Sequence, residues 1–321
     1  MIIAIEEHFW SPGLRDVYPE RFVGFIRRLT GEGRLDDLGD GRIGELDAAG
    51  IDMQVLSHFI PGAQDLDART APALARASNN HLHAAIKRHP DRLAGFATLP
   101  TPAPEVAADE LERCVTELGF KGALINGATH NEFLDAKKYH VILARAEALG
   151  VPLYLHPRTP HPDVMKAYFH DHFALSQAAW GYAVETGTHA LRLILSGVFD
   201  KFPKLTVILG HLGENIPFAL WRFDHSIVSH APIADNPYGH LQKRPRDYFL
   251  QNFLITTSGH FDPVALRCAI KIVGADRILF ATDYPVESAK MATEFLRKAD
   301  LSTDEREKIS HRNARHYLGI V

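Results

Sequence analysis

The chain has 321 residues and a formal net charge of −4, with 46% hydrophobic and 23% charged residues. These ordinary globular values exclude a disordered, collagen-like or coiled-coil protein, and the slightly acidic balance argues against a nucleic-acid partner. Because the two cysteines lie far apart and no signal-like or membrane-spanning apolar stretch is visible, we expect a cytoplasmic protein without disulfides or a membrane partner.

Eight short apolar runs, each bounded by turn signals, predict eight strands. Most runs are continuously hydrophobic and rich in β-branched residues, which is typical of parallel strands buried on both faces. In chain order, the predicted strands are residues 2–5, 52–56, 93–98, 122–125, 152–155, 205–209, 253–257 and 277–281.

Helical patterns separate most of these strands. The predicted helices are residues 70–88, 104–118, 137–149, 173–195, 215–229, 263–273, 286–299 and 302–317. The last of them begins with a predicted capping box, because Glu305 stands three residues after Ser302.

Strands that alternate with helices over this length predict a (β/α)8 barrel, which we take as a single domain over residues 1–321. An open doubly wound sheet is the alternative, but no glycine-rich phosphate loop follows the first strand. Residues 11–47 and 230–252 are insertions into the bare barrel pattern, and we expect them to build pockets or subunit contacts.

Polar residues follow the apolar runs at the strand ends, where a barrel of this type places its active site. They include Glu6, Glu7, His8, Ser57, His58, Asn126, His156, Arg158, His211, Glu214, His260 and Asp283. A single histidine at a strand end is commonly structural, but acidic or imidazole side chains after four separate strands favour a shared polar site.

The first motif, Glu6-Glu7-His8, has a geometric consequence. Residues two apart on a strand face the same side, so Glu6 and His8 can both face the barrel axis while Glu7 faces away. With His156 and Asp283 they would form a mixed nitrogen and oxygen site that suits Zn²⁺ or Mn²⁺. We expect Glu7 to make a structural hydrogen bond or salt bridge with the helical layer.

At these residues the sequence resembles the amidohydrolase superfamily, with Glu6-x-His8 in place of the usual His-x-His start. It is most similar to the non-oxidative decarboxylases of γ-resorcylate, 2,3-dihydroxybenzoate and 5-carboxyvanillate, in the branch that includes aminocarboxymuconate semialdehyde decarboxylase. The similar segments are residues 5–9 (Ile-Glu-Glu-His-Phe), 124–127, 154–158 (Tyr-Leu-His-Pro-Arg), 208–214 (Ile-Leu-Gly-His-Leu-Gly-Glu), 221–225 and 281–285 (Ala-Thr-Asp-Tyr-Pro).

The resemblance implies a distorted (β/α)8 barrel with one divalent metal ion, Zn²⁺ or Mn²⁺, at the carboxyl ends of its strands. The implied metal ligands are Glu6, His8, His156 and Asp283, and the implied catalytic residues are Asp283, His211 and Glu214. The resemblance also implies a homodimer or homotetramer, with residues 230–252 as a candidate contact.

Five residues are candidates for binding the substrate, a small aromatic carboxylic acid. The resemblance implies that Arg222 and Asn126 hold its polar groups. Phe9 and Tyr284 are candidates for stacking on an aromatic ring, and His58 is a candidate for lining the pocket. The loops after the first two strands differ from the resorcylate enzymes, which leaves the particular acid open.

The implied reaction replaces the carboxylate of a hydroxylated benzoate with a proton. A neighbouring hydroxyl allows the ring carbon to be protonated first, with Asp283 as the predicted donor, and CO2 then leaves the dearomatised intermediate. The reaction should run in reverse at high bicarbonate. No organic cofactor is expected, because no nucleotide or pyridoxal phosphate motif is visible.

Two other functions stay open. A mononuclear metal-dependent hydrolase of a lactone or amide could use the same metal site, with Asp283 activating water. Asn126 argues against a dinuclear hydrolase, because a lysine at this strand end would be needed as the carbamylated bridging ligand. A metal-dependent scaffold without enzymatic activity is the other alternative.

Overall fold

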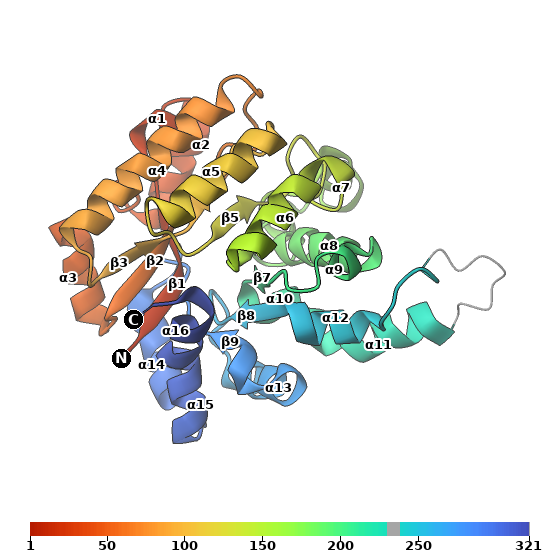
Figure 1. The fold of residues 1–321 in the computed structure, drawn as a ribbon. Helices are drawn as coiled ribbons and strands as arrows, with labels where there is room; N and C mark the ends of the chain where they lie inside the picture. The colour runs from red at the N-terminus through yellow and green to blue at the C-terminus, as the bar shows by residue number, and fades with distance from the viewer. Residues whose placement is uncertain (230–237, 321) are drawn as a thin grey trace.

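The computed structural model describes residues 1–229 and 238–320, and short parallel strands surrounded by helices form its centre (Figure 1). One sheet contains β1 (Ile3–Phe9), β2 (Met53–His58) and β3 (Leu93–Gly95). The second sheet contains β4 (Ala97–Thr98), β5 (Ala123–Asn126), β6 (Leu153–His156), β7 (Val207–Leu209), β8 (Phe253–Thr256) and β9 (Ile278–Leu279). All neighbouring strands are parallel, as the continuous hydrophobic runs predict.

Backbone hydrogen bonds join the edges of the two sheets into a ring. The Phe96 amide donates to Leu56 O at 2.8 Å, which links β2 to the start of β4. The Ile5 amide donates to Phe280 O at 3.2 Å, which links β1 to the segment after β9. The described residues therefore form a distorted barrel with two breaks in its sheet. The barrel prediction is confirmed, and the open doubly wound alternative is wrong.

Most strand bounds shift by one to two residues, and two departures from the prediction are larger. Residues 93–98 form two strands, because the chain pairs first with β2 and then with β5. β1 continues to Phe9, four residues past its predicted end, because the backbone of its polar residues still pairs with β2. A strand therefore continues through polar residues when their backbone groups are still paired with the neighbouring strand.

Apolar side chains pack on both faces of the barrel wall. The interior cluster includes Ile3, Ile5, Val55, Phe96, Leu124, Tyr154, Ile208, Leu254 and Leu279. A larger cluster fills the layer between the strands and the helices, and it includes Leu56, Leu82, Leu111, Leu143, Leu193, Leu209 and Phe253. The strand ends, where such a barrel places its active site, are therefore supported by closely packed side chains.

Helices cover the outside of the strands (Figure 1). In chain order they are α1 (Pro12–Arg15), α2 (Glu20–Thr30), α3 (Asp40–Ala49), α4 (Ala71–Arg88), α5 (Pro104–Thr116), α6 (His140–Leu149), α7 (Pro162–Tyr168), α8 (Gly181–Leu195), α9 (Val198–Lys201), α10 (His211–Glu214), α11 (Ile216–Ser229), α12 (Pro245–Asn252), α13 (Pro263–Val273), α14 (Ala289–Lys298), α15 (Thr303–Glu307) and α16 (Asn313–Leu318). Among the described residues, none of the helices is long and apolar enough to cross a membrane.

The predicted helix over residues 173–195 is wrong in its first part. Only a short 3₁₀ turn, Phe173–Ser176, precedes α8, which begins at Gly181. The chain folds back so tightly there that a Cβ on Gly181 would lie 2.4 Å from Ser176 O. By contrast, the capping box that opens α15 is confirmed, with Ser302 Oγ accepting from the Glu305 amide.

The two predicted insertions carry extra helices. Residues 11–47 contain α1, α2 and most of α3, and residues 230–252 end in α12. Residues 230–237, the first part of the predicted subunit contact, lie outside the described residues.

Candidate active site

An irregularity in β1 decides which of its polar residues face the barrel interior. Ile3 and Ile5 belong to the interior cluster, so strict alternation would place Glu7 inside. The pairing with β2 shifts register between Ala4 and Glu7, as a β-bulge does, and the phase changes. Glu6 and His8 therefore face inward, as the first motif predicts.

The structure brings together the four residues that were predicted as metal ligands. Glu6, His8, His156 and Asp283 each offer one ligand atom, and these atoms all lie within 4.8 Å of one another. They come from β1, the end of β6 and the turn after β9. Backbone bonds hold the two distant segments together, since the Asp283 amide donates to Glu6 O at 2.9 Å.

The free atoms of this cluster fit a metal ion. Glu6 Oε2 accepts hydrogen bonds from Tyr154 Oη and from Thr256 Oγ1, the latter at 3.3 Å. Glu6 Oε1 is buried without a hydrogen-bond partner among the described residues, 3.6 Å from His156 Nε2. His8 Nδ1 lies 3.1 Å from Ser57 Oγ. Two carboxylates and two imidazoles, oriented in this way, form a donor set for Zn²⁺ or Mn²⁺.

Burial and neighbouring charges shift the pKa values of this cluster. Burial raises the pKa of Glu6 and lowers that of His156 well below its usual value. Burial also favours a raised pKa for Asp283, but its interactions with His211 and His8 outweigh burial and lower that pKa. Asp283 is therefore a carboxylate in the metal-free chain.

Glu7 points to the opposite side of β1. Its Oε2 accepts from Gln54 Nε2 at 2.8 Å and from Thr282 Oγ1 at 2.7 Å, and its Oε1 accepts from the Thr282 amide at 2.8 Å. Burial raises the pKa of Glu7 to about 8. The predicted structural hydrogen bonding of Glu7 is confirmed, although its partners lie on β2 and after β9 and not on a helix.

His211 and Glu214 lie beside this cluster on α10. His211 Nδ1 and Glu214 Oε1 are 2.8 Å apart, and His211 Nε2 lies 3.8 Å from Asp283 Oδ2. Burial lowers the pKa of His211, but the negative charges of Glu214 and Glu6 outweigh burial and raise it well above its usual value. The predicted catalytic residues thus form one chain of charged groups that ends at Asp283.

The backbone is strained where these groups are presented. His211, Glu214 and Asp283 have positive φ angles of 51°, 53° and 66°. Such angles are unusual for residues with a Cβ and are common at functional sites. Gly210 is required just before α10, because a Cβ there would lie 2.9 Å from Glu6 Oε2.

A cavity of about 540 Å³ opens onto the cluster, which is within the usual range for small-molecule sites. Its polar side is formed by His156, His211, Glu214, His260 and Asp283. Its remaining walls come from α2, from the loop after β2, from residues 177–183 and from the turn before α14. They include Phe25, Ile26, Leu29, Phe59, Ile60, Gln177, Trp180, Tyr182, Val286 and Glu287.

Sequence reasoning missed most of these wall residues. The apolar residues of α2 give the helix an apolar face, which marks Phe25, Ile26 and Leu29 as candidate contact residues without placing them at a cavity. No comparable signal marks Gln177 or Glu287, whose position depends on how the loops pack.

Four predicted substrate-binding residues do not line this cavity. Phe9 is buried against His58. Tyr284 is also buried, and the guanidinium carbons of Arg34 and Arg42 lie 4.8 and 4.7 Å from the centroid of its ring.

The other two residues of this group are held by the backbone around them. His58 Nε2 accepts from the Ser11 amide at 3.1 Å, and its Nδ1 lies 2.8 Å from Phe59 O. Burial lowers the pKa of His58 to about 3, so the ring is neutral. Asn126 donates to His58 O at 3.2 Å. The structure therefore gives Phe9, Tyr284, His58 and Asn126 positions in the frame around the cavity.

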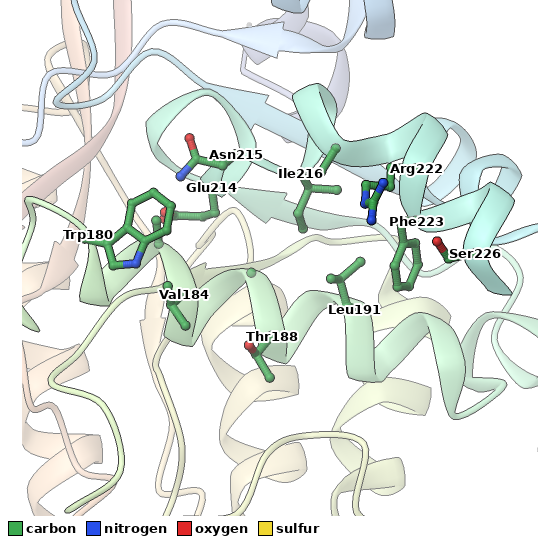
Figure 2. Close-up of a pocket in the computed structure, with 13 residues that line it drawn as sticks. Trp180, Val184, Thr188, Leu191, Glu214, Asn215, Ile216, Arg222, Phe223 and Ser226 are labelled. Atoms are coloured by element: carbon green, nitrogen blue, oxygen red, sulfur yellow. The ribbon is translucent and has the colours of Figure 1, made fainter. Parts of the chain in front are cut away.

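Arg222, the fifth predicted substrate-binding residue, lines a neighbouring cavity of about 440 Å³ between α8 and α11. Figure 2 shows Trp180, Glu214 and Asn215 at one end of that cavity, with Arg222, Phe223 and Ser226 at the other. Trp180 and Glu214 border both cavities. Within a single chain, Arg222 does not reach the cluster.

Comparisons with known proteins agree with this geometry. The amidohydrolase family model matches residues 6–320. A γ-resorcylate decarboxylase from Polaromonas sp. is 40% identical, over 99% of this chain and 98% of its own length. The crystal structure of dihydroxybenzoic acid decarboxylase from Polaromonas sp. with bound manganese and the inhibitor 2-nitroresorcinol is similar at a TM-score of 0.89 and 39% identity, covering 99% of this chain and 96% of that one.

A second solved structure is also similar in fold. The crystal structure of 5-carboxyvanillate decarboxylase from Sphingomonas paucimobilis has a TM-score of 0.92 and 35% identity, covering 100% of this chain and 99% of that one. The chain belongs to the amidohydrolase family. Within that family it falls in the branch of the γ-resorcylate and 5-carboxyvanillate decarboxylases, as its motifs predict.

Proposed function

We propose that this chain is a metal-dependent, non-oxidative decarboxylase of a hydroxylated benzoate. The observation that carries the proposal is the buried cluster of Glu6, His8, His156 and Asp283 at the base of a largely apolar cavity. The relatives described above, which match the whole length of the chain, support the same class of reaction.

Glu6, His8, His156 and Asp283 would hold one divalent ion. A bound ion would supply positive charge that attracts the substrate carboxylate and favours ionisation of a neighbouring phenol. Tyr154 and Thr256 orient Glu6, and Ser57 orients His8, so the ligand atoms are positioned before an ion binds. Manganese in the related Polaromonas structure supports Mn²⁺, and the donor set also accepts Zn²⁺.

Asp283 is the proposed proton donor to the ring carbon that carries the carboxylate. In the resting chain the proton lies on His211, because Glu214 stabilises the imidazolium at 2.8 Å. Passing this proton from His211 Nε2 to Asp283 Oδ2, over 3.8 Å, would prepare the donor. The protonated ring carbon then releases CO2, and the electrons of the broken carbon–carbon bond restore the aromatic ring.

The apolar walls would hold the ring and exclude water from it. Phe59 lies against the imidazoles of His8 and His156, with ring centroids 4.9 and 6.1 Å apart. An aromatic acid that enters with its carboxylate toward the cluster would therefore meet an aromatic side chain beside the metal ligands.

The test is CO2 release from a panel of ortho- and para-hydroxybenzoates, by protein reconstituted with Mn²⁺ or with Zn²⁺, with small lactones and amides alongside. We expect CO2 release from at least one hydroxybenzoate, and loss of that activity after chelation. Turnover of a lactone or amide without CO2 would instead establish the hydrolase alternative. Total inactivity on both classes of substrate would favour the scaffold alternative.

The remaining predictions from the sequence stay part of this proposal. We infer that the chain acts as a single domain over residues 1–321, in the cytoplasm and as a homodimer or homotetramer, without an organic cofactor. The family match over residues 6–320 supports the single domain. Light scattering of the purified protein would measure the oligomeric state.

A further inference from the structure

Glu287 is a carboxylate on the cavity wall that belongs to none of the motifs described above. It stands four residues after Asp283 in the turn before α14, and its amide donates to Asp283 O at 3.0 Å. Because this turn fixes the backbone of both residues, the two acidic side chains border the same cavity.

The other acidic residues of the cavity have partners. Glu214 is paired with His211 at 2.8 Å, and Asp283 lies 3.1 Å from His8 Nε2. The Glu287 carboxylate makes no hydrogen bond or ion pair within the part of the chain that the structure describes. It also borders an outer hollow that contains Arg34 and Lys290, and it pairs with neither of them.

The electric field of Glu287 acts inside the cavity. The side chain is half-buried, and its pKa is raised first by burial and then by the negative charge of Asp283, while His211 lowers it. Both neighbours belong to the polar side of the cavity, so the carboxylate lies close enough to affect a ligand bound there.

Lysine and arginine are absent from the described residues that line this cavity. A substrate that directs one carboxylate toward the metal cluster and His211 would therefore find no lysine or arginine for a second carboxylate, and would find Glu287 instead. A hydroxyl group in the same place could donate a hydrogen bond to Glu287, and bonds of this kind to a charged acceptor are stronger than neutral ones.

We propose that Glu287 is a specificity-determining residue that favours hydroxylated monocarboxylic acids and rejects aromatic acids with a second carboxylate. This inference rests on the proposed function and narrows it. The similar proteins include decarboxylases of both kinds, since γ-resorcylate carries one carboxylate and 5-carboxyvanillate carries two. Overall sequence similarity therefore does not distinguish the two types of substrate, whereas the negative charge of Glu287 does.

The experiment compares kcat/KM for γ-resorcylate and 5-carboxyvanillate in the Mn²⁺-loaded wild type, in Glu287→Gln and in Glu294→Gln. Glu294 is a matched control, because it lies on α14 but does not line the cavity. We expect the wild type to prefer γ-resorcylate by at least about 100-fold, and Glu287→Gln to reduce this preference by about tenfold. Most of the change should be a lower KM for the dicarboxylic acid, and Glu294→Gln should keep the wild-type ratio.

A wild type that prefers the dicarboxylic acid would overturn the proposal. So would a Glu287→Gln variant with an unchanged ratio, or with equal changes for both acids. A thermal midpoint equal to that of the wild type would show that the variant is folded.

A binding measurement separates this inference from the proposed reaction. Calorimetry would give Kd for benzoate and for isophthalate, its counterpart with a second carboxylate, whether or not CO2 is released. Glu287→Gln should bind isophthalate about tenfold more tightly and change benzoate binding by less than about twofold. This result would support the role of Glu287 even if no hydroxybenzoate were decarboxylated, and equal changes for both ligands would contradict it.

Discussion

The two sides of the cavity are built in different ways. The polar side stands on the ends of β6, β7, β8 and β9, whose backbones are paired with neighbouring strands. The opposite side is built from α2 and residues 177–183, where Phe25, Leu29 and Trp180 remain 44%, 51% and 53% exposed. The difference indicates that the chemistry is fixed by the strand ends, whereas the choice of substrate depends on the loops and helices around them.

The largest effect on activity is expected from Asp283→Asn, on the polar side of the cavity. We expect kcat to fall by about 10³-fold in protein that still carries its metal, because the amide cannot deliver the proton. CO2 release should be measured together with metal content, at saturating Mn²⁺. Asp276→Asn is the control, since Asp276 makes a surface ion pair with Lys308 at 2.9 Å. A metal-loaded Asp283→Asn enzyme with its full rate would contradict the donor role.

The adjacent residues Glu6 and Glu7 offer a sharper test of the same region. Both are fully buried, but only Glu6 belongs to the four-residue cluster. Glu6→Gln should weaken metal binding by at least about 10²-fold, since the loss of a group that only orients a metal ligand already lowers metal affinity by about 10- to 100-fold. Glu7→Gln should keep the metal. Elemental analysis after dialysis against limiting Mn²⁺ would distinguish the two variants, and equal metal loss in both would show that the assignment of β1 is wrong.

The next prediction concerns the pH dependence of stability and a buried histidine on α8. His189 Nε2 accepts from the Leu134 amide at 3.0 Å, and burial lowers the pKa of His189 to about 3. An unfolded histidine titrates near about pH 6.5, so the contribution of His189 to stability is complete above that pH. It is lost as the pH falls from there toward 3, at about 1.4 kcal/mol per pH unit.

Urea unfolding of metal-free protein at pH 7 and pH 5 would test this slope. His189→Gln should be less stable than the wild type at pH 7, and the difference should shrink by about 2 kcal/mol at pH 5. His316→Gln, at an exposed position, is the control. A difference that is the same at both pH values would exclude His189 as the titrating group.

The contrast between the two sides of the cavity also explains which parts of the site could be predicted from the sequence. The cluster was predictable, because four short polar motifs each follow a buried strand and parallel strands bring such ends together. The bulge in β1 was not, although the inward orientation of Glu6 and His8 depends on it. Phe9 could have been excluded from the pocket by the alternation used for Glu7, because neighbours of His8 on a strand face the other way.

The walls were not predictable, since no local pattern fixes where an inserted helix packs. The apolar residues of α2 indicate that one face of this helix is covered, but they do not say by what. Glu287 and Gln177 have no periodic pattern at all. Their place in the cavity follows from the turn after Asp283 and from the fold-back before Gly181, and neither turn has a repeating sequence pattern that would predict it.

The smallest effect on activity is expected from Trp180→Ala, on the side of the cavity that α2 and residues 177–183 form. Trp180 is 53% exposed and borders both cavities, so its removal should leave stability within about 0.5 kcal/mol of the wild type. The loss of one aromatic contact, about 1 kcal/mol, should raise KM about fivefold, and kcat should stay within about twofold because the barrel side is untouched. Trp221→Ala is the matched control, since Trp221 is 69% exposed and borders neither cavity. A Trp180→Ala enzyme that lost kcat and kept KM would show that the two sides of the cavity are coupled, and that the chemistry is not separate from the binding of the substrate.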